Sequence, residues 1–155
     1  MSRRDDSGNA ADSGNAVIEF IFVAVMILVP MVYFVTAVAS IQRSNLGVSE
    51  AARDAGRAFA TGVSTQDGLT RADAAIRLAM ADQGLPDDAT VRFVAVDGNC
   101  DSGSIDPVLV PGAEFAICVM RRTTLPAVPT LLAGKGIRTV GRYVVHVDDF
   151  RTVRP

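Results

Sequence analysis

The chain carries one charged side chain in a place where charge is costly. Glu19 is the only charged residue between Asp12 and Arg43, and it stands directly before an apolar run at residues 20–39 (FIFVAVMILVPMVYFVTAVA). A carboxylate within a membrane-spanning helix costs about 2.5–3.5 kcal/mol on insertion scales, so it normally has a partner. Because Glu19 lies at the edge of the run, the alternative is a carboxylate solvated among lipid headgroups.

Elsewhere, the residues that could support catalysis or metal binding are few. His146 is the single histidine and alternates with valines, so it is expected on a strand face. The loop 97–106 (DGNCDSGSID) matches the first three oxygen positions of an EF-hand, but Ser102 replaces the glycine and Val108 the closing glutamate. A turn loop that uses these side chains for its own backbone is the better account. We expect no enzyme activity, no cofactor and no bound metal.

The two cysteines, Cys100 and Cys118, both follow the apolar run. In an oxidising compartment the simplest expectation is one disulfide between them. Closing a loop of this length could stabilise the fold by about 3 kcal/mol. In a cytoplasmic domain the same pair would be two free thiols.

The apolar run is long enough to cross a membrane. At about 1.5 Å rise per residue it forms a helix of roughly 30 Å, the thickness of a bilayer's hydrocarbon core. Arginines flank the run on both sides, so the positive-inside rule does not settle the orientation. A short N-terminal tail stays behind more readily than it crosses, and both cysteines then face an oxidising compartment. The sequence therefore favours a single-pass cell-membrane protein with a cytoplasmic N-terminus and an extracytoplasmic C-terminal domain.

Three fates of the N-terminal segment compete, and each gives a different mature N-terminus. An ordinary secretory signal would be cut before Ser40, but the apolar run is too long and its leading segment carries more aspartates than arginines. An uncleaved anchor would keep Met1. The third fate follows from a resemblance to a type IV prepilin processing site, because Gly14 is followed five residues later by Glu19 at the head of an apolar helix.

Cleavage after Gly14 would make Asn15 the first residue of the mature chain and Glu19 the fifth, with Phe20 opening the apolar run. The pentapeptide around Gly14, DSGNA, also begins at Asp6, but no carboxylate and no apolar run follow that copy at the same spacing. In pilin-like filaments, the proposed partner of such a glutamate is the freed N-terminal amine of an adjacent subunit. The resemblance thus implies that processing and assembly are linked.

Three further stretches extend the resemblance over most of the chain: SEAARDAGRA at residues 49–58, LPAVP at 125–129 and VDDFR at 147–151. Together with the processing segment, they resemble the TadE-like minor pilins, or pseudopilins, of tight-adherence (Flp, type IV-like) pilus systems of the actinobacterial type. The resemblance implies cleavage by a prepilin peptidase, contact with membrane lipid and the membrane assembly platform, and incorporation in a pilus with the major Flp pilin and other minor pilins. Flp major pilins are essentially all helix, so this longer chain resembles the accessory subunit.

The expected fold class is α+β: a long N-terminal transmembrane helix continues into a small domain with a short helix packed on a three- to four-stranded antiparallel sheet. The expected divisions are a cytoplasmic leader peptide at 1–14, a transmembrane helix at 15–39, an extracytoplasmic continuation of the helix at 40–60 and a small α+β extracytoplasmic domain at 61–155. The continuation is expected to pack on the chain's own sheet rather than on a neighbouring subunit through an apolar face at helical spacing, namely Ile41, Val48, Ala52, Ala55 and Phe59.

Within the small domain, Gly62–Gly68 is expected to form a turn, and Thr70 to cap a helix over 71–83 that ends at Gly84. Strands are expected over residues 90–96, 113–122 and 139–148. The connecting loops are of moderate length, so an antiparallel meander is the economical pairing.

The formal net charge is −2 and no basic face stands out along the sequence, which argues against nucleic-acid binding. The interpretation that uses the most residues is a structural, non-enzymatic minor pilin. The alternative is an uncleaved single-pass envelope protein whose outer domain binds a ligand or protein partner.

Overall fold

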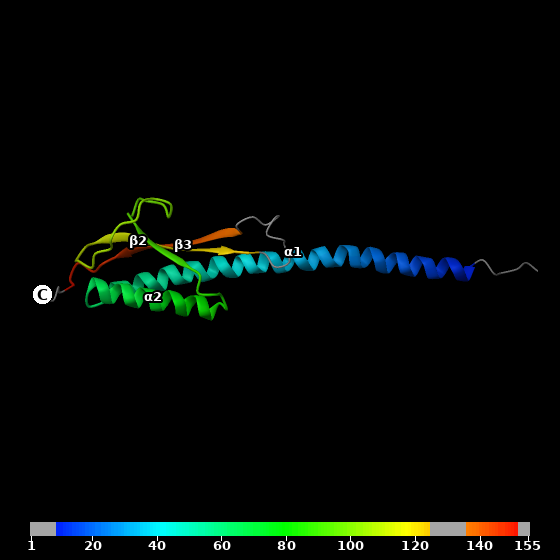
Figure 1. Cartoon of the computed structure of the whole chain (residues 1–155), viewed down its shortest axis with the longest axis horizontal. Helices are drawn as coiled ribbons and strands as arrows, with labels where there is room; N and C mark the ends of the chain where they lie inside the picture. The colour runs from blue at the N-terminus through cyan, green and yellow to red at the C-terminus, as the bar shows by residue number, and fades with distance from the viewer. Residues whose placement is uncertain (1–8, 125–135, 152–155) are drawn as a thin grey trace, which may run out of the picture. The chain divides into compact units, whose positions relative to one another are not determined.

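A computed structural model describes residues 9–124 and 136–151, with side chains described from residue 16 onward. The chain divides into two units, Met1–Val38 and Ala39–Pro155. The helix α1 (Asn9–Ala60) contributes to both units (Figure 1). The second unit also contains α2 (Thr65–Asp82) and the strands β1 (Thr90–Val94), β2 (Glu114–Thr123) and β3 (Ile137–His146). The expected α+β class is confirmed: a long apolar N-terminal helix, a shorter helix and a three-stranded antiparallel sheet.

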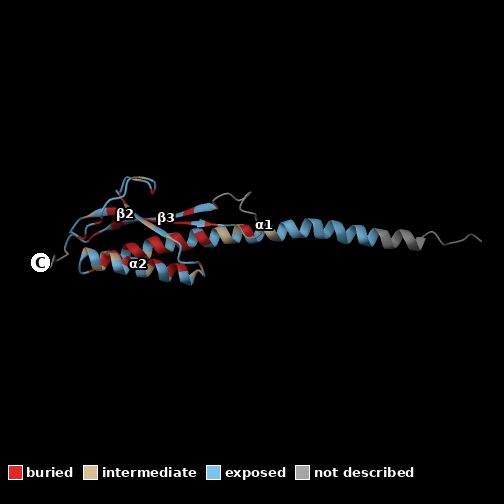
Figure 2. Ribbon diagram, in the orientation of Figure 1, coloured by how far each residue is buried: buried red, intermediate tan, exposed pale blue. Residues whose placement is uncertain are grey.

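The first half of α1 exposes its apolar side chains. Every Val, Ile, Leu, Met and Phe from Val17 to Val35 is exposed, with Phe20 at 73% and Met26 at 68% (Figure 2). This half is long and apolar enough to cross a membrane by its length and composition.

The second half of α1 forms part of a hydrophobic core. Val48, Ala52, Ala55 and Phe59 are fully buried, as their spacing predicts, whereas Ile41 is only half-buried. They lie in one cluster with apolar side chains of α2, β2 and β3, so the chain's own sheet and second helix cover this face. The expectation that the face packs within its own domain is confirmed.

The sheet has the strand order β1-β2-β3 and antiparallel pairing throughout, which confirms the expected meander. Because side chains alternate along a strand, β2 presents Phe115, Ile117 and Val119 to the helices and the side chains between them to the opposite, outer face. Both helices lie on the inner face (Figure 1). There Phe115 meets Phe59 at a centroid distance of 5.2 Å in an edge-to-face arrangement.

Small residues bring α1 close to β3. A Cβ atom on Gly141 would overlap the carbonyl group of Val48, and one on Gly56 would overlap the ring of Tyr143. One turn before Val48, Ser44 Oγ lies 2.8 Å from Thr139 Oγ1. Residue numbers increase in the same direction along α1 and β3 at these contacts, so the helix runs parallel to that strand.

The helix α2 starts earlier than expected, so the assignment of Thr70 as the cap was wrong, and the turn predicted over Gly62–Gly68 is confined to its first part, before Thr65. Ser64 is the N-cap, and its hydroxyl accepts a hydrogen bond of 3.2 Å from the N–H of Asp67. Gly68 lies inside the helix, where an added Cβ would be 2.9 Å from the carbonyl oxygen of Phe59. This glycine serves a close helix–helix contact and does not form a turn. The expected end is confirmed, since Gly84 follows the helix at φ +63°.

The strands match their expected ranges to within two residues at each end. β1 stops at Val94 rather than Val96 because the chain turns there, with Gly98 donating to the carbonyl of Ala95 at 2.9 Å. Near the C-terminus, Arg151 of the VDDFR stretch donates to the carbonyl of Ala60 at 2.7 Å, at the end of α1. A cation is favourable at a helix C-terminus, where backbone carbonyls lack helical partners. The Pro-rich stretch at 125–129 lies outside the described residues.

Candidate functional site

The predicted processing segment lies on α1. The helix begins at Asn9, so the bond between Gly14 and Asn15 is inside it, and Glu19 and Phe20 follow about one turn later. Glu19 and Phe20 are both exposed. Among the residues whose side chains the structure describes, no cation lies within ion-pair distance of Glu19. The segment therefore presents a carboxylate without an intramolecular partner in the described residues, at the head of an exposed apolar helix.

A peptide bond inside a helix is a poor protease substrate until the helix opens locally, because its backbone groups are already hydrogen-bonded. Glycine is the weakest helix former after proline, at about 1 kcal/mol relative to alanine. Gly14 therefore lowers the free energy needed to open α1 at the candidate cleavage point.

The two cysteines form the expected disulfide. Cys100 and Cys118 are bonded, with their Cα atoms 5.6 Å apart. Cys118 lies on the outer face of β2, and Cys100 belongs to the loop after β1, so the bond ties this loop over the sheet. Val94, Ala116 and Met120 surround the disulfide and complete a second, smaller apolar cluster.

The loop after β1 uses its polar side chains for its own backbone, as the turn interpretation predicts. Asn99 Oδ1 accepts from the N–H of Asp101 at 2.8 Å, and Ser102 Oγ accepts from the N–H of Asn99 at 3.0 Å. Within the described ranges, no group of three or more His, Cys, Asp or Glu side chains is placed to hold a metal ion.

A buried polar cluster that sequence patterns did not predict joins α1 to the sheet. Ser44 is fully buried, and Thr123 Oγ1 lies 2.7 Å from its hydroxyl. Arg121 also donates to Ser44 Oγ, at 3.3 Å, and forms a two-bond ion pair with Asp88 at 2.9 and 3.1 Å. The Arg121 side chain is only 6% exposed, so this pairing satisfies a charge that burial would otherwise make costly. The cluster fixes the register between α1 and both long strands.

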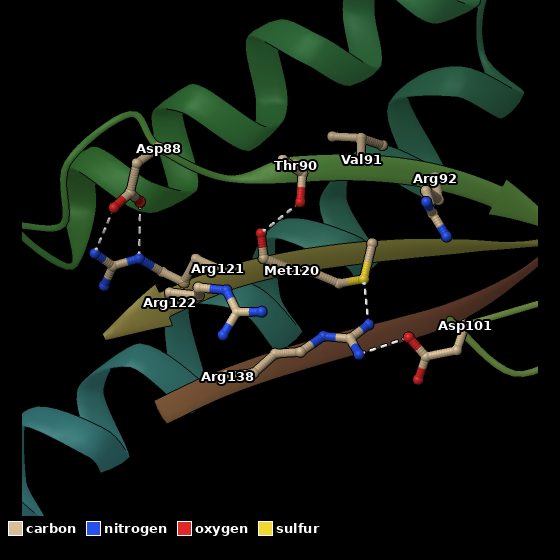
Figure 3. Close-up of a pocket in the computed structure, with 9 residues that line it drawn as sticks. All are labelled: Asp88, Thr90, Val91, Arg92, Asp101, Met120, Arg121, Arg122 and Arg138. Atoms are coloured by element: carbon tan, nitrogen blue, oxygen red, sulfur yellow. Dashed lines mark hydrogen bonds and ion pairs between the residues drawn. The ribbon is translucent and has the colours of Figure 1, made fainter. Parts of the chain in front are cut away.

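Sequence patterns likewise did not predict a groove on the outer face of the sheet. It has a volume of about 640 Å³, and four arginines and two aspartates are among its lining residues (Figure 3), namely Asp88, Thr90, Val91, Arg92, Asp101, Met120, Arg121, Arg122 and Arg138. The arginines come from three strands that are far apart in the sequence, so no long run of basic residues in the sequence indicates a basic groove. Strand alternation combined with the register places Arg92, Arg122 and Arg138 on the outer face, whereas Arg121 points to the inner face.

His146 lies exposed at the end of β3, as its alternating pattern predicts. Its Nδ1 is 3.0 Å from Glu114 Oε1 on the neighbouring strand, and its Nε2 is 3.7 Å from Asp149 Oδ2. The hydrogen bond with Glu114, aided by the charge of Asp149, raises the pKa of His146 above its ordinary value. The two carboxylates and the imidazole form a surface charge cluster.

No protein-family model, curated protein or solved structure matches this chain.

Proposed function

We propose that the protein is a structural, non-enzymatic subunit of a pilus-like assembly, of the TadE-like minor pilin or pseudopilin kind. In this proposal a prepilin peptidase removes residues 1–14, and the mature chain sits in the cell membrane with its C-terminal domain outside the cytoplasm. The chain then joins other minor pilins and a major Flp pilin through the membrane assembly platform.

The observation that carries the proposal is that the two halves of α1 differ in burial. Its first half exposes apolar side chains from Val17 to Val35 around a single carboxylate, whereas its second half is the centre of the domain's core. A subunit that passes from a membrane into a filament needs both properties on one helix. It needs an apolar stretch that contacts lipid or neighbouring helices, and a fixed attachment to a folded domain.

Glu19 gives the apolar stretch a carboxylate that could form an ion pair with the N-terminal amine of a neighbouring subunit. Cleavage after Gly14 would place a new amine on Asn15, four residues before the carboxylate and about 6 Å away along the helix axis. An amine at that depth on a neighbouring subunit would neutralise Glu19, which has no cation within ion-pair distance among the described side chains.

The mature N-terminus tests the proposal directly. We expect mass spectrometry of the protein extracted from its native membrane to give a chain that starts at Asn15. Gly14→Ala should abolish this processing, whereas Gly8→Ala, which changes the same pentapeptide in its upstream copy, should leave it intact. A chain that retains Met1 would identify an uncleaved anchor, and a chain that starts at Ser40 would identify a secretory signal.

The alternative function, an uncleaved single-pass envelope protein with a binding domain, draws support from one feature. The arginine-lined groove on the outer face of the sheet is open to a ligand. Retention of Met1 together with an intact outer domain would favour this alternative.

A further inference from the structure

Like charges lie opposite each other on the outer face of the sheet. Arg122 of β2 and Arg138 of β3 are direct cross-strand partners in the antiparallel register. Two like charges at such positions destabilise a sheet unless another group compensates for them. Asp101 compensates the charge of Arg138, since its Oδ1 lies 2.6 Å from Nη1 of that arginine (Figure 3). No ion pair of this kind compensates the charge of Arg122 among the described residues.

The groove keeps an excess of positive charge after its internal pairs are counted. Asp88 is paired with Arg121, and Asp101 with Arg138. Among the residues that the structure describes, Arg92 and Arg122 have no carboxylate within ion-pair distance. The stretch 125–135, which follows β2, has the sequence LPAVPTLLAGK, which contains no Asp or Glu. Two guanidinium groups on neighbouring strands are thus available to an external anion.

The groove lies beside the first turns of α1 in the second unit. Arg121 and Thr123 flank Arg122 in the sequence, and both hydrogen-bond to Ser44 of α1. Ser44 follows Ala39, the last residue of the apolar run, by five residues, or about 7.5 Å of helix. The headgroup layer on each side of a bilayer is roughly 5–7 Å thick. If the run spans a membrane, Ser44 and the strand residues that hydrogen-bond to it follow the span closely enough along the chain for Arg122 to reach lipid phosphates.

We propose that this groove binds the phosphate of an anionic phospholipid headgroup through Arg92 and Arg122, with Arg138 at its edge. The proposal rests on the membrane span of the proposed function. Guanidinium groups present forked donors that match phosphate oxygens, and they are weakly hydrated compared with ammonium groups. A bound phosphate between the strands relieves the repulsion between Arg122 and Arg138.

The experiment uses the full chain in lipid nanodiscs that contain phosphatidylcholine and phosphatidylglycerol, and native mass spectrometry to measure which lipid stays bound. We expect the wild-type protein to retain phosphatidylglycerol in preference. A juxtamembrane arginine contributes about fivefold to binding of an anionic surface, so the double variant R92Q/R122Q should lose about 25-fold of this preference. The matched control R53Q/R57Q removes the same charge from the exposed face of α1 and should keep the preference.

Several outcomes would overturn the proposal. An unchanged preference in R92Q/R122Q would exclude the groove, and an equal loss in the control would reveal a general charge effect. Full displacement of phosphatidylglycerol by excess inorganic phosphate would identify a soluble phosphate as the ligand instead of a lipid. Failure of the wild-type chain to enter nanodiscs would refute the membrane span, and with it the proposed function, whereas entry without lipid preference would refute this inference alone.

A second measurement separates binding from folding. In nanodiscs of phosphatidylcholine alone, R122Q removes a cross-strand repulsion and should unfold at the same temperature as the wild-type protein or higher, by circular dichroism. A lower midpoint would mean that Arg122 supports the fold itself, which contradicts a role in holding an external anion.

Discussion

At the residue scale, His146 reports how the exposed end of the sheet responds to pH. Its contact with Glu114 raises its pKa, so the folded domain holds the imidazolium proton more tightly than the unfolded chain does. The resulting stabilisation is fully present below the unfolded pKa of about 6.5 and is lost as the pH rises through the folded value. Because the group is exposed, the effect on the free energy of unfolding is small.

A proton NMR titration can test this assignment without ambiguity, because the chain has one histidine. We expect an imidazole pKa above its ordinary value in the wild-type protein. Glu114→Gln should lower the pKa because it removes the closer carboxylate, at 3.0 Å, whereas Asp149→Asn should lower it less, since that carboxylate is 3.7 Å away. Equal effects of the two variants would contradict the geometry.

At the element scale, α1 and β3 approach so closely that their contact requires glycine. The Cβ atom that Gly141→Ala adds would overlap the backbone of Val48 at the centre of the core. Overpacking of this kind forces the backbone to shift, so we expect a loss of at least about 2 kcal/mol in the free energy of unfolding. Chemical denaturation followed by circular dichroism measures this loss.

Gly103→Ala is the matched control, because nothing lies within 4 Å of the added Cβ. Its effect should stay within about 0.5 kcal/mol. A similar stability of the two variants would show that α1 and β3 separate without cost, which would contradict the packing described above.

Another close glycine contact, between Gly68 and Phe59, shows which parts of the fold were predictable from the sequence. The apolar face of α1, its continuation beyond the apolar run and the three strands follow from periodicity and β-branched content, which are local properties. The role of Gly68 was not predictable in this way. A glycine between two periodic segments is typical of a turn, and only the position of Phe59 on another helix shows that it serves helix packing.

The features of the candidate site likewise differ in whether local sequence or tertiary contacts determine them. The cysteine pair could be predicted because the chain has only two cysteines and both follow the apolar run. The processing role of Gly14 and Glu19 stays a prediction. The groove and the Ser44 cluster could not be identified, because they depend on the register between strands and on which arginine points inward. Arg121 and Arg122 are adjacent in sequence, yet one is buried beside Ser44 and the other is exposed on the opposite face.

At the scale of the whole molecule, assembly should depend on Glu19. Under the proposed function, Glu19→Ala should leave cleavage after Gly14 largely intact, because the peptide bond and its glycine are unchanged. It should reduce the amount of the subunit in sheared pili relative to the membrane fraction, because the carboxylate that would pair with a neighbour's amine is gone. Immunoblots of the two fractions measure the partition.

Glu50→Ala removes a carboxylate from the same helix beyond the apolar run and should not change the partition. If Glu19→Ala subunits enter pili as efficiently as wild-type subunits, the pairing of Glu19 with an amine does not occur.

The attachment of α1 within its own domain has a mechanical consequence. Tension along the buried half of α1 acts parallel to β3, since the two run parallel, and so loads the contacts of Gly141, Phe59 and Ala60 in the same direction. Such a load shears all these contacts at once instead of peeling them off one after another. Shear loading distributes tension over many bonds, so we expect the second unit to resist force applied along this part of α1.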